Sequence, residues 1–440
     1  MRLIIALCAL AACGGAASAQ APGGVRPDLA PPYASTAPRG AADSLHLSRR
    51  QVIAEALARN PQLDVAREQT AEARARRVTA VAVPDPAFTA AYDQATGPFA
   101  FRGAGSRPVG LELDVPFPDK FRLNNRIGLA DIRANESNVR LQQQSIALQA
   151  SAAYDSLLVA LGHRRNLTEA SQLAADFLNR TQARFEAGTA AKLDVIQAQV
   201  GVAQAQNDLI ANDRDVAAAQ ASLNRVLGRL AGAPVSPADS LDLPASLPDS
   251  TAIEQEALAN RPELAIVQHQ RQGARANTSL IKEFWLPDLT FAVTRDYAQP
   301  GSPLFTTGVA LPLPAFYWQH ARGDIAQAQH VERELEATDR DTRAFVLQDV
   351  RTAYANASTA LRQVAFLRDQ LVPAAREAYR VASTSYSLGG SSALEVLSAR
   401  SALLAAQLQL TDALAAANTA RADLDRALGA PVPTAGGITR

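Results

Sequence analysis

Residues 184–198 read RFEAGTAAKLDVIQA, and residues 385–399 repeat their pattern as SYSLGGSSALEVLSA. Phe185 and Tyr386 are 201 positions apart, and Gly188 and Gly389 keep the same offset. In each copy an apolar-periodic segment stops at glycine, and a second such segment begins a few residues later. This pattern is typical of one helix ending and another beginning. The sequence therefore predicts two long antiparallel helical hairpins, each closed by a tight turn at one of these glycines.

The offset of 201 recurs along the chain, which predicts an internal duplication. Ala56-Leu57 corresponds to Ala257-Leu258, and the segment 223–228 (LNRVLG) corresponds to 424–429 (LDRALG). Ala/Pro-rich stretches before, between and after the copies read as irregular segments. We expect a signal peptide at 1–19, a leader at 20–44, a first repeat at 45–229, a connector at 230–251, a second repeat at 252–429 and a tail at 430–440.

The first 19 residues have the character of a secretory signal, with a basic start, an apolar run and Ala17-Ser18-Ala19 before Gln20. A bacterial lipoprotein box, LAAC, ends at Cys13 and would instead give a lipid anchor. We expect cleavage after Ala19, because a twelve-residue signal would be unusually short. Cys8 and Cys13 are the only cysteines, so a mature chain cleaved after Ala19 would have no disulfide and no thiolate metal site.

Composition narrows the class of protein. The net charge is +0, which argues against nucleic acid as a partner. Aromatic residues make up only 5%, which suits long helices packed through small side chains. No segment after the signal has about 18 consecutive apolar residues, so we expect no membrane-spanning helix, whereas a β-type span stays open.

Two segments in each half change from helical to strand-like periodicity. In the first half these are residues 88–92 and 109–115, and in the second half residues 289–294 and 309–313. Strict alternation in 109–115 gives a strand with one apolar and one polar face. We therefore expect one two-stranded hairpin per half. Glu112 and Asp114 fall on the polar face, where they either line a channel and favour cations or belong to the exposed face of a soluble sheet.

The longest helical pattern runs from Asp119 to Phe185, roughly 100 Å at 1.5 Å per residue. A return helix is expected at about 190–227, and the second half repeats the plan. Pro373 falls inside the second long helix, where it should kink or break the helix. The fold class is therefore mainly α with a small β part.

Four amphipathic strands cannot close a barrel, and a bilayer does not tolerate open sheet edges. Membrane β-barrels begin at eight strands, so two or more chains would have to share one barrel. The helices carry too much charge to lie in lipid and would project into water as a stalk. These features suggest a conduit anchored in an outer membrane.

The duplicated plan and the two tips with Gly-x(4)-Leu-Asp/Glu-Val resemble the TolC family of outer membrane efflux factors, from about Leu47 to Gly429. The resemblance implies a homotrimer with a shared twelve-stranded β-barrel and a periplasmic α-barrel. It also implies a passive duct without catalysis, docked onto a periplasmic adaptor and an inner-membrane pump of the resistance-nodulation-division type. The motifs NPQL at 60–63 and LDVPFP at 113–118 are nearer to the heavy-metal and cation branch.

By the same resemblance, Asp194 and Tyr386 would form a tie that closes the periplasmic gate, and Glu395 would belong to an acidic entrance ring. Arg184, Gly188 and Gly389 would mark the tips where the adaptor docks. The family's tie-forming arginine and a second ring acid are replaced here by Ser391 and Ser398.

Simpler roles for the gate residues stay open. A carboxylate in a first helical turn, as at Asp194 or Glu395, is favoured by the helix dipole, and Ser392-x-x-Glu395 is a capping box. Tyr386 would then pack beside its turn.

No catalytic signature is present in the sequence: there is no G-x-S-x-G, P-loop or Cys/His pair. The five histidines do not have metalloprotease spacing, so we predict no enzyme, no cofactor and no metal site. The alternative to a duct is a periplasmic adaptor or coiled-coil scaffold, which usually has one helical hairpin rather than two. The substrate and the identity of the pump cannot be derived from these residues.

Overall fold

The computed structural model describes residues 45–90, 108–244, 252–286, 288–296, 304–310 and 317–431, together with residues 247 and 249. The chain divides into two compact units, residues 1–42 and 43–440, and every described residue belongs to the second. The signal peptide, both candidate cleavage sites and most of the C-terminal tail lie outside the described residues.

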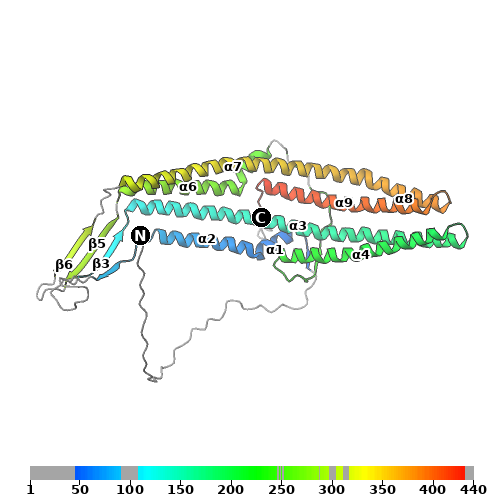
Figure 1. The fold of residues 1–440 in the computed structure, drawn as a ribbon, viewed down its shortest axis with the longest axis horizontal. Helices are drawn as coiled ribbons and strands as arrows, with labels where there is room; N and C mark the ends of the chain where they lie inside the picture. The colour runs from blue at the N-terminus through cyan, green and yellow to red at the C-terminus, as the bar shows by residue number, and fades with distance from the viewer. Residues whose placement is uncertain are drawn as a thin grey trace, which may run out of the picture. The chain divides into compact units, whose positions relative to one another are not determined.

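The helices follow the duplicated plan (Figure 1). The first repeat contains α1 (Arg49–Arg59), α2 (Pro61–Ala80), α3 (Pro118–Glu186) and α4 (Lys192–Val226). The second contains α5 (Ile253–Asn260), α6 (Pro262–Lys282), a 3-10 turn (Glu283–Trp285), α7 (Tyr317–Phe366), a π-helix (Leu367–Leu371), α8 (Val372–Ser387) and α9 (Ala393–Ala427). The two hairpins, α3–α4 and α7/α8–α9, are therefore confirmed.

The two repeats begin their second helices differently. Asn60 caps α2 by accepting a hydrogen bond from the Gln62 backbone at 2.9 Å. Its counterpart Arg261 makes no side-chain cap and is 2% exposed. Arg261 instead forms ion pairs with Asp349 at 2.9 Å and Glu263 at 3.1 Å. A buried guanidinium with two acidic partners thus replaces an amide cap in the second repeat.

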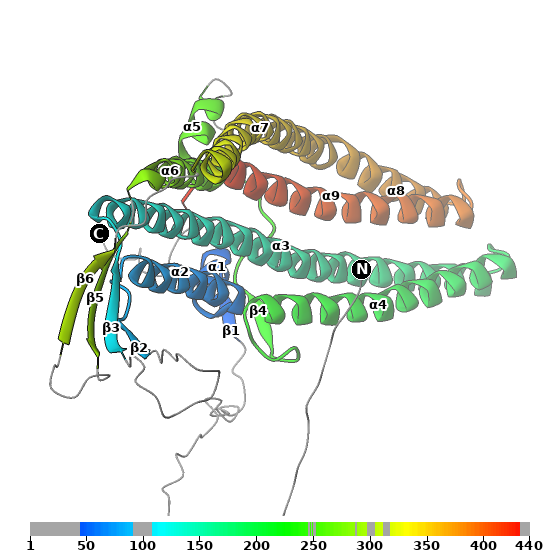
Figure 2. The same ribbon diagram turned by 60° about the vertical axis from the view of Figure 1, so that its left-hand side comes forward.

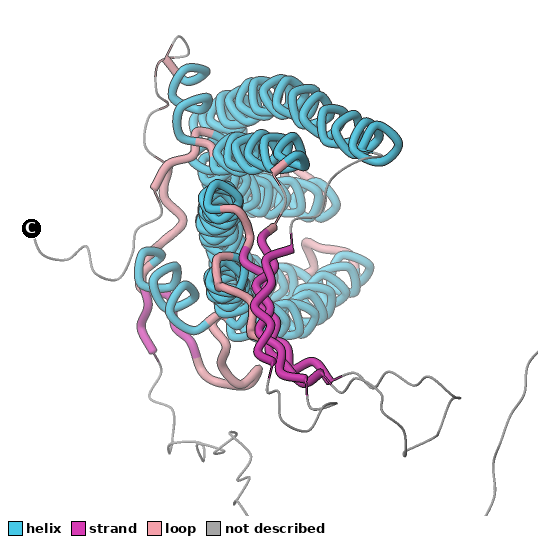
Figure 3. The backbone as a smooth tube through the Cα atoms, turned by 90° about the vertical axis from the view of Figure 1, so that its left-hand side faces the viewer, coloured by secondary structure: helices cyan, strands magenta, loops and turns pink. Residues whose placement is uncertain are grey.

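Four antiparallel strands form one sheet in the order β2-β3-β5-β6, seen nearly edge-on in Figure 3. They are β2 (Ala87–Ala90), β3 (Pro108–Val115), β5 (Leu289–Asp296) and β6 (Leu304–Ala310). Each repeat gives one hairpin, as predicted, and β3 pairs with β5 to join them. The expected strand at 309–313 was placed too late, because β6 pairs along β5 from Asp296 onwards.

The sheet has one apolar and one polar face. The register places Leu111 opposite Phe88 and Val293, and Leu113 opposite Phe291. The alternate positions have small or polar residues, such as Thr290 opposite Asp114. Since residues that are paired across strands lie on one face, the alternation predicted for β3 extends across the sheet.

A second, two-stranded sheet was not predicted. β1 (Leu45–Leu47) pairs in parallel with β4 (Val235–Pro237), inside the segment expected to be an irregular connector (Figure 2). The Tyr154 hydroxyl, on α3, donates to the Leu47 carbonyl at 2.9 Å. These contacts fix the connector beside the middle of α3.

The helix α3 is the centre of the packing, since it contacts α2 and α4 of its own repeat and α6 and α9 of the other. Apolar clusters lie at equivalent places in both repeats, around Leu157 and Leu223 in one and Val350 and Leu424 in the other. An 18-residue window of α3 is long and apolar enough to cross a membrane by composition, with mean hydropathy 1.2, and 50% of it is buried. That window was not expected from the sequence, and a buried core helix has the same composition.

Candidate functional site

The first hairpin turns at Gly188, whose φ is +72°. The Thr189 amide donates to the Arg184 carbonyl at 2.9 Å, and the Gly188 amide donates to the Phe185 carbonyl at 2.9 Å. This is a Schellman end, in which a left-handed residue lets the chain cover the last helical carbonyls. Only glycine adopts this φ at little cost, which confirms the predicted turn.

The second hairpin turns in the same way at Gly389, with φ +84°. The Gly390 amide donates to the Ser385 carbonyl at 2.8 Å. Because β3 precedes α3 directly and the turn at Gly188 follows it, the sheet and the tips lie at opposite ends of α3 (Figure 1).

The acids just after the turns cap the return helices. The Ala191 amide donates to the Asp194 carboxylate at 3.4 Å. In the second hairpin the Ser392 amide donates to the Glu395 carboxylate at 3.2 Å, and the Glu395 amide donates back to the Ser392 hydroxyl at 3.3 Å. The full capping box predicted for Ser392 and Glu395 is therefore present, and Asp194 supplies half of one.

The two tips are joined by Arg184. Its guanidinium donates to the Tyr386 carbonyl, at the last turn of α8, and to the Thr189 carbonyl at 3.2 Å. It also lies 4.6 Å from the centroid of the Tyr386 ring. A guanidinium over a tyrosine face gains cation–π attraction, and the helix C-terminus adds negative dipole. We call the two contacts of Arg184 with Tyr386, one to its carbonyl and one to its ring, the Arg184 clamp.

The single chain does not show the predicted tie between Asp194 and Tyr386, which stays a prediction for the assembled protein. Tyr386 is 4% exposed, and its ring packs against Phe177 at 5.2 Å between centroids. Its hydroxyl has no hydrogen-bond partner in the described chain, and Asp194 is engaged in its cap. Tyr386 belongs to an apolar cluster at the tips that also includes Ala198 and Val396.

Ser391 and Ser398, which stand where the family pattern has an arginine and an acid, make local hydrogen bonds. Ser391 donates to the Ala382 carbonyl at 3.0 Å, and Ser398 donates to the Glu395 carbonyl at 2.9 Å. Ser391 thus fastens the second turn to its own helix and makes no bond to the first hairpin.

The contact of Arg184 with Tyr386 was not predicted, because the sequence pattern indicates only that Arg184 lies at the tip. A basic residue in the last turn of a helix is favoured by the dipole, and its counterpart in the second repeat is Ser385. That asymmetry was the available signal. Its partner depended on how the two hairpins pack, which no spacing in the sequence reveals.

At the other end of α3, Glu112 and Asp114 lie on the polar face of the sheet, as predicted. Their cross-strand neighbours are Ala292 and Thr290, and the Thr290 hydroxyl donates to Asp114. No Lys or Arg shares this face among the described strand residues, because Arg295 falls on the apolar face and stacks on Phe305 at 5.2 Å. The polar face is therefore acidic.

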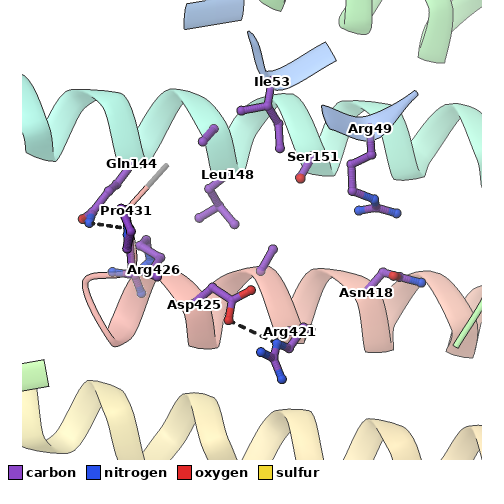
Figure 4. Close-up of a pocket in the computed structure, with 13 residues that line it drawn as sticks. Arg49, Ile53, Gln144, Leu148, Ser151, Asn418, Arg421, Asp425, Arg426 and Pro431 are labelled. Carbon is purple, nitrogen blue, oxygen red and sulfur yellow. Dashed lines mark hydrogen bonds and ion pairs between the residues drawn. The ribbon is translucent and has the colours of Figure 1, made fainter. Parts of the chain in front are cut away.

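A cavity of about 280 Å³ lies between the repeats, with α1 and α3 on one side and α9 on the other (Figure 4). Its guanidinium groups are all paired: Arg49 with Asp155, Arg421 with Asp425, and Arg426 with Asp349. The described residues hold no group of three metal-ligating side chains. The cavity thus offers no unpaired charge to a ligand, and we place the functional site at the tips and the sheet.

Comparisons with known proteins agree with this geometry. The sequence model of the family described as "Outer membrane efflux protein" matches residues 52–229 and 253–430, one match per repeat. The alkaline protease secretion protein AprF of Pseudomonas aeruginosa is 26% identical over 69% of this chain and 65% of its own length. The cobalt-zinc-cadmium resistance protein CzcC of Cupriavidus metallidurans is 22% identical over 74% of this chain and 78% of its own.

Solved structures show the same fold. The outer membrane protein VceC of Vibrio cholerae superimposes with a TM-score of 0.72 at 18% identity, over 87% of this chain and 96% of that one.

Proposed function

The chain belongs to the outer membrane efflux protein family, and from this premise we propose that it is the outer membrane channel of a tripartite efflux system. The duct itself would be passive, with no catalytic step. It would take substrates from an inner-membrane pump of the resistance-nodulation-division type through a periplasmic adaptor. The helical hairpins would stand in the periplasm.

The observation that carries this proposal is the four-stranded sheet with one apolar and one polar face. β2 and β6 are edge strands, and unpaired edges are not tolerated in a bilayer. Closing the sheet therefore needs further copies, and a homotrimer would supply twelve strands. Its apolar face would meet lipid, and its polar face would line the lumen.

Neighbouring residues on β5 give a matched test. Val293 is on the apolar face, and Ala292 is on the polar face opposite Glu112. Arginine on the lipid face near the bilayer midplane costs about 2–4 kcal/mol, whereas a lumen position tolerates charge. Val293→Arg should therefore abolish the heat-modifiable trimer in outer membrane fractions, and Ala292→Arg should retain it.

A protein that salt washes from membranes would contradict the proposal, as would equal effects of the two arginines. An adaptor or scaffold would give the first result. The presence of two hairpins alternating with amphipathic strand pairs favours the duct, because an adaptor usually has one hairpin.

We place the periplasmic entrance at the two tips, with six turns in a trimer. Gly188 and Gly389 would form the surface where the adaptor docks. The Arg184 clamp would hold the entrance of each protomer closed, with Asp194 and Glu395 adding negative charge beside it. This proposal rests on the bonds that Arg184 makes across the hairpins.

The class of substrate follows from the acidic polar face. Glu112 and Asp114 would favour cations in the lumen. One relative is named for cobalt, zinc and cadmium resistance, whereas another is named for protease secretion. We propose a cation preference of the pore, and the pump decides which molecule enters it.

A further inference from the structure

The outgoing helix of the second hairpin is interrupted, whereas its counterpart in the first is continuous. α7 ends at Phe366, and a π-helix spans Leu367–Leu371 before α8 begins. The Val372 amide donates to the Leu367 carbonyl, five residues back. In α3 the equivalent stretch runs without a break to Glu186. The π-helix thus inserts one extra residue in the second hairpin only.

Pro373 explains the position of the interruption. Proline has no amide hydrogen, and in an α-helix its ring clashes with the carbonyl four residues back, here Asp369. A π-helix widens the turn and relieves that clash. The first repeat has Gln172 at the equivalent position and needs no such adjustment. The kink that the sequence predicts at Pro373 is therefore built as a widened turn before it.

The π-helix is also loosely packed. None of its residues is buried, and Phe366 beside it is 53% exposed. A groove of about 600 Å³ lies between the end of α7 and α9, and it reaches the first residue of the π-helix, Leu367, opposite Gln409 and Asp412. Few apolar contacts and a widened turn make a helix segment easy to bend.

At the level of this groove, α9 is tied to the first hairpin. Asn166 donates to the Thr411 hydroxyl at 3.0 Å, and His163 lies 2.9 Å from Asp412. The Gln407 amide donates to Glu169 at 3.1 Å. These bonds hold α9 against α3 at residues 407–412. Motion of the two hairpins relative to each other is therefore hindered on the side of these residues that is nearer the sheet.

On the side nearer the tips, the second hairpin is attached to the first by the contacts of Arg184 with Tyr386. Between the two, Arg400 makes one long bond of 3.5 Å to the Gly201 carbonyl. The part of the second hairpin between residues 407–412 and its tip is thus held at its two ends. The π-helix between α7 and α8 lies at the end farther from the tip.

We propose that the π-helix Leu367–Leu371 is a hinge about which α8 swings, so that release of the Arg184 clamp moves the second tip away from the first. The lower part of α9 follows by gentle bending, as long helices do. The use of this motion to open an entrance rests on the proposed function. The motion itself is a property of the chain that can be measured without transport.

Deleting Asp369 tests the hinge. Asp369 is exposed and pairs only with its neighbour Arg368 among the described residues. The deletion is made together with Pro373→Ala, because removing one residue from the π-helix restores an α-helix in register only when the proline ring that clashes with that helix is also removed. Spin labels at Gln182→Cys on α3 and Val381→Cys on α8 report the separation of the tips by pulsed electron resonance. A sample without introduced cysteines measures the background from Cys8 and Cys13.

The distances are compared in the trimer with and without Arg184→Ala, each with and without the deletion. We expect Arg184→Ala to lengthen and broaden the distance distribution, and the deletion to return it to the wild-type width. Pro373→Ala alone keeps the extra residue and should leave the broadening in place. Broadening that survives the deletion would overturn the hinge, and so would an Arg184→Ala protein whose tips stay together.

Heat-modifiable trimers in all variants show that the deletion has not unfolded the protein. Failure of the duct would appear as loss of outer membrane localisation in the wild type. Failure of the hinge would appear only in the distances.

Discussion

The guanidinium of Arg184, at the end of α3, donates to the carbonyl of Tyr386, at the end of α8, and stacks on the same residue's ring. One side chain from the first repeat thereby fixes the last turn of the second. Since Ser385 stands at the equivalent position, the second repeat cannot return the contact. The tie between the hairpins is one-sided.

Replacing Arg184 with alanine should open the entrance. A charge-assisted hydrogen bond and a cation–π contact together stabilise the closed tips by about 2 kcal/mol, which corresponds to about thirtyfold in the open population. The measurement is single-channel conductance in planar bilayers. Arg184→Lys, which keeps the charge but not the planar fork, should fall between the two. A conductance unchanged by Arg184→Ala would contradict the clamp.

Tyr386→Phe should leave conductance and thermal stability nearly unchanged, because the hydroxyl is buried and has no partner among the described residues. Removing an unsatisfied buried polar group costs nothing in hydrogen bonds and favours the folded state slightly. Tyr386→Ala is the contrasting variant, because it removes the ring that Arg184 and Phe177 contact. If Tyr386→Phe opens the pore as strongly as Tyr386→Ala, then the hydroxyl does have a partner in the assembled trimer.

The buried ion cluster of the second repeat should respond to single and double changes in opposite ways. Asp349→Asn leaves Arg261 and Arg426 short of an acid and should lower the stability by about 3 kcal/mol. The double variant Arg261→Asn, Asp349→Gln reproduces Asn60 and Gln149 of the first repeat and should be nearly neutral, since it removes both members of the buried ion pair. Thermal melting of the detergent-solubilised trimer measures both. A double variant less stable than the single one would refute this account.

Stability should depend on pH through Asp155. Burial raises the pKa of its carboxyl above the usual 3.8, and Arg49 lowers that pKa by less. A raised pKa means that folding favours the protonated acid, so this contribution is complete below 3.8 and is lost as the pH rises through the raised value. The melting temperature of the wild type relative to Asp155→Asn should therefore fall over that rise.

Arg49→Gln supplies the control for Asp155. Without the guanidinium the pKa of Asp155 should rise further, and the fall in relative stability should extend to higher pH. A wild-type protein that gains stability over Asp155→Asn through the same rise would show that the ion pair outweighs burial.

Cation preference should depend on the polar strand face. Neutralising Glu112 and Asp114 with Gln and Asn removes two carboxylates per chain without changing their size. The reversal potential of the pore in a salt gradient should shift toward zero. Arg295→Gln alters a charge on the opposite face of the same sheet and should have no such effect. An unaltered potential in the Glu112, Asp114 double variant would place the selectivity elsewhere.

Most of the fold could be predicted from the sequence because its signals are local and repeated. Gly188 and Gly389 each mark a turn between helices, and strict alternation marks β3. The start of β6 and the pairing of β1 with β4 could not be predicted in this way. Both depend on a partner strand distant in sequence, and short segments carry little periodicity of their own.

The sequence by itself determined two hairpins with glycine turns, two amphipathic strand pairs and their relation by a duplication, because each follows from residues within a few positions of one another. Only the tertiary structure decided what meets at the tips. In the structure Tyr386 contacts Arg184, because α3 packs beside α8, whereas Asp194 caps its own helix. The widened turn before Pro373 is of the same kind: proline forbids the regular helix, and the surrounding packing selects the form that replaces it.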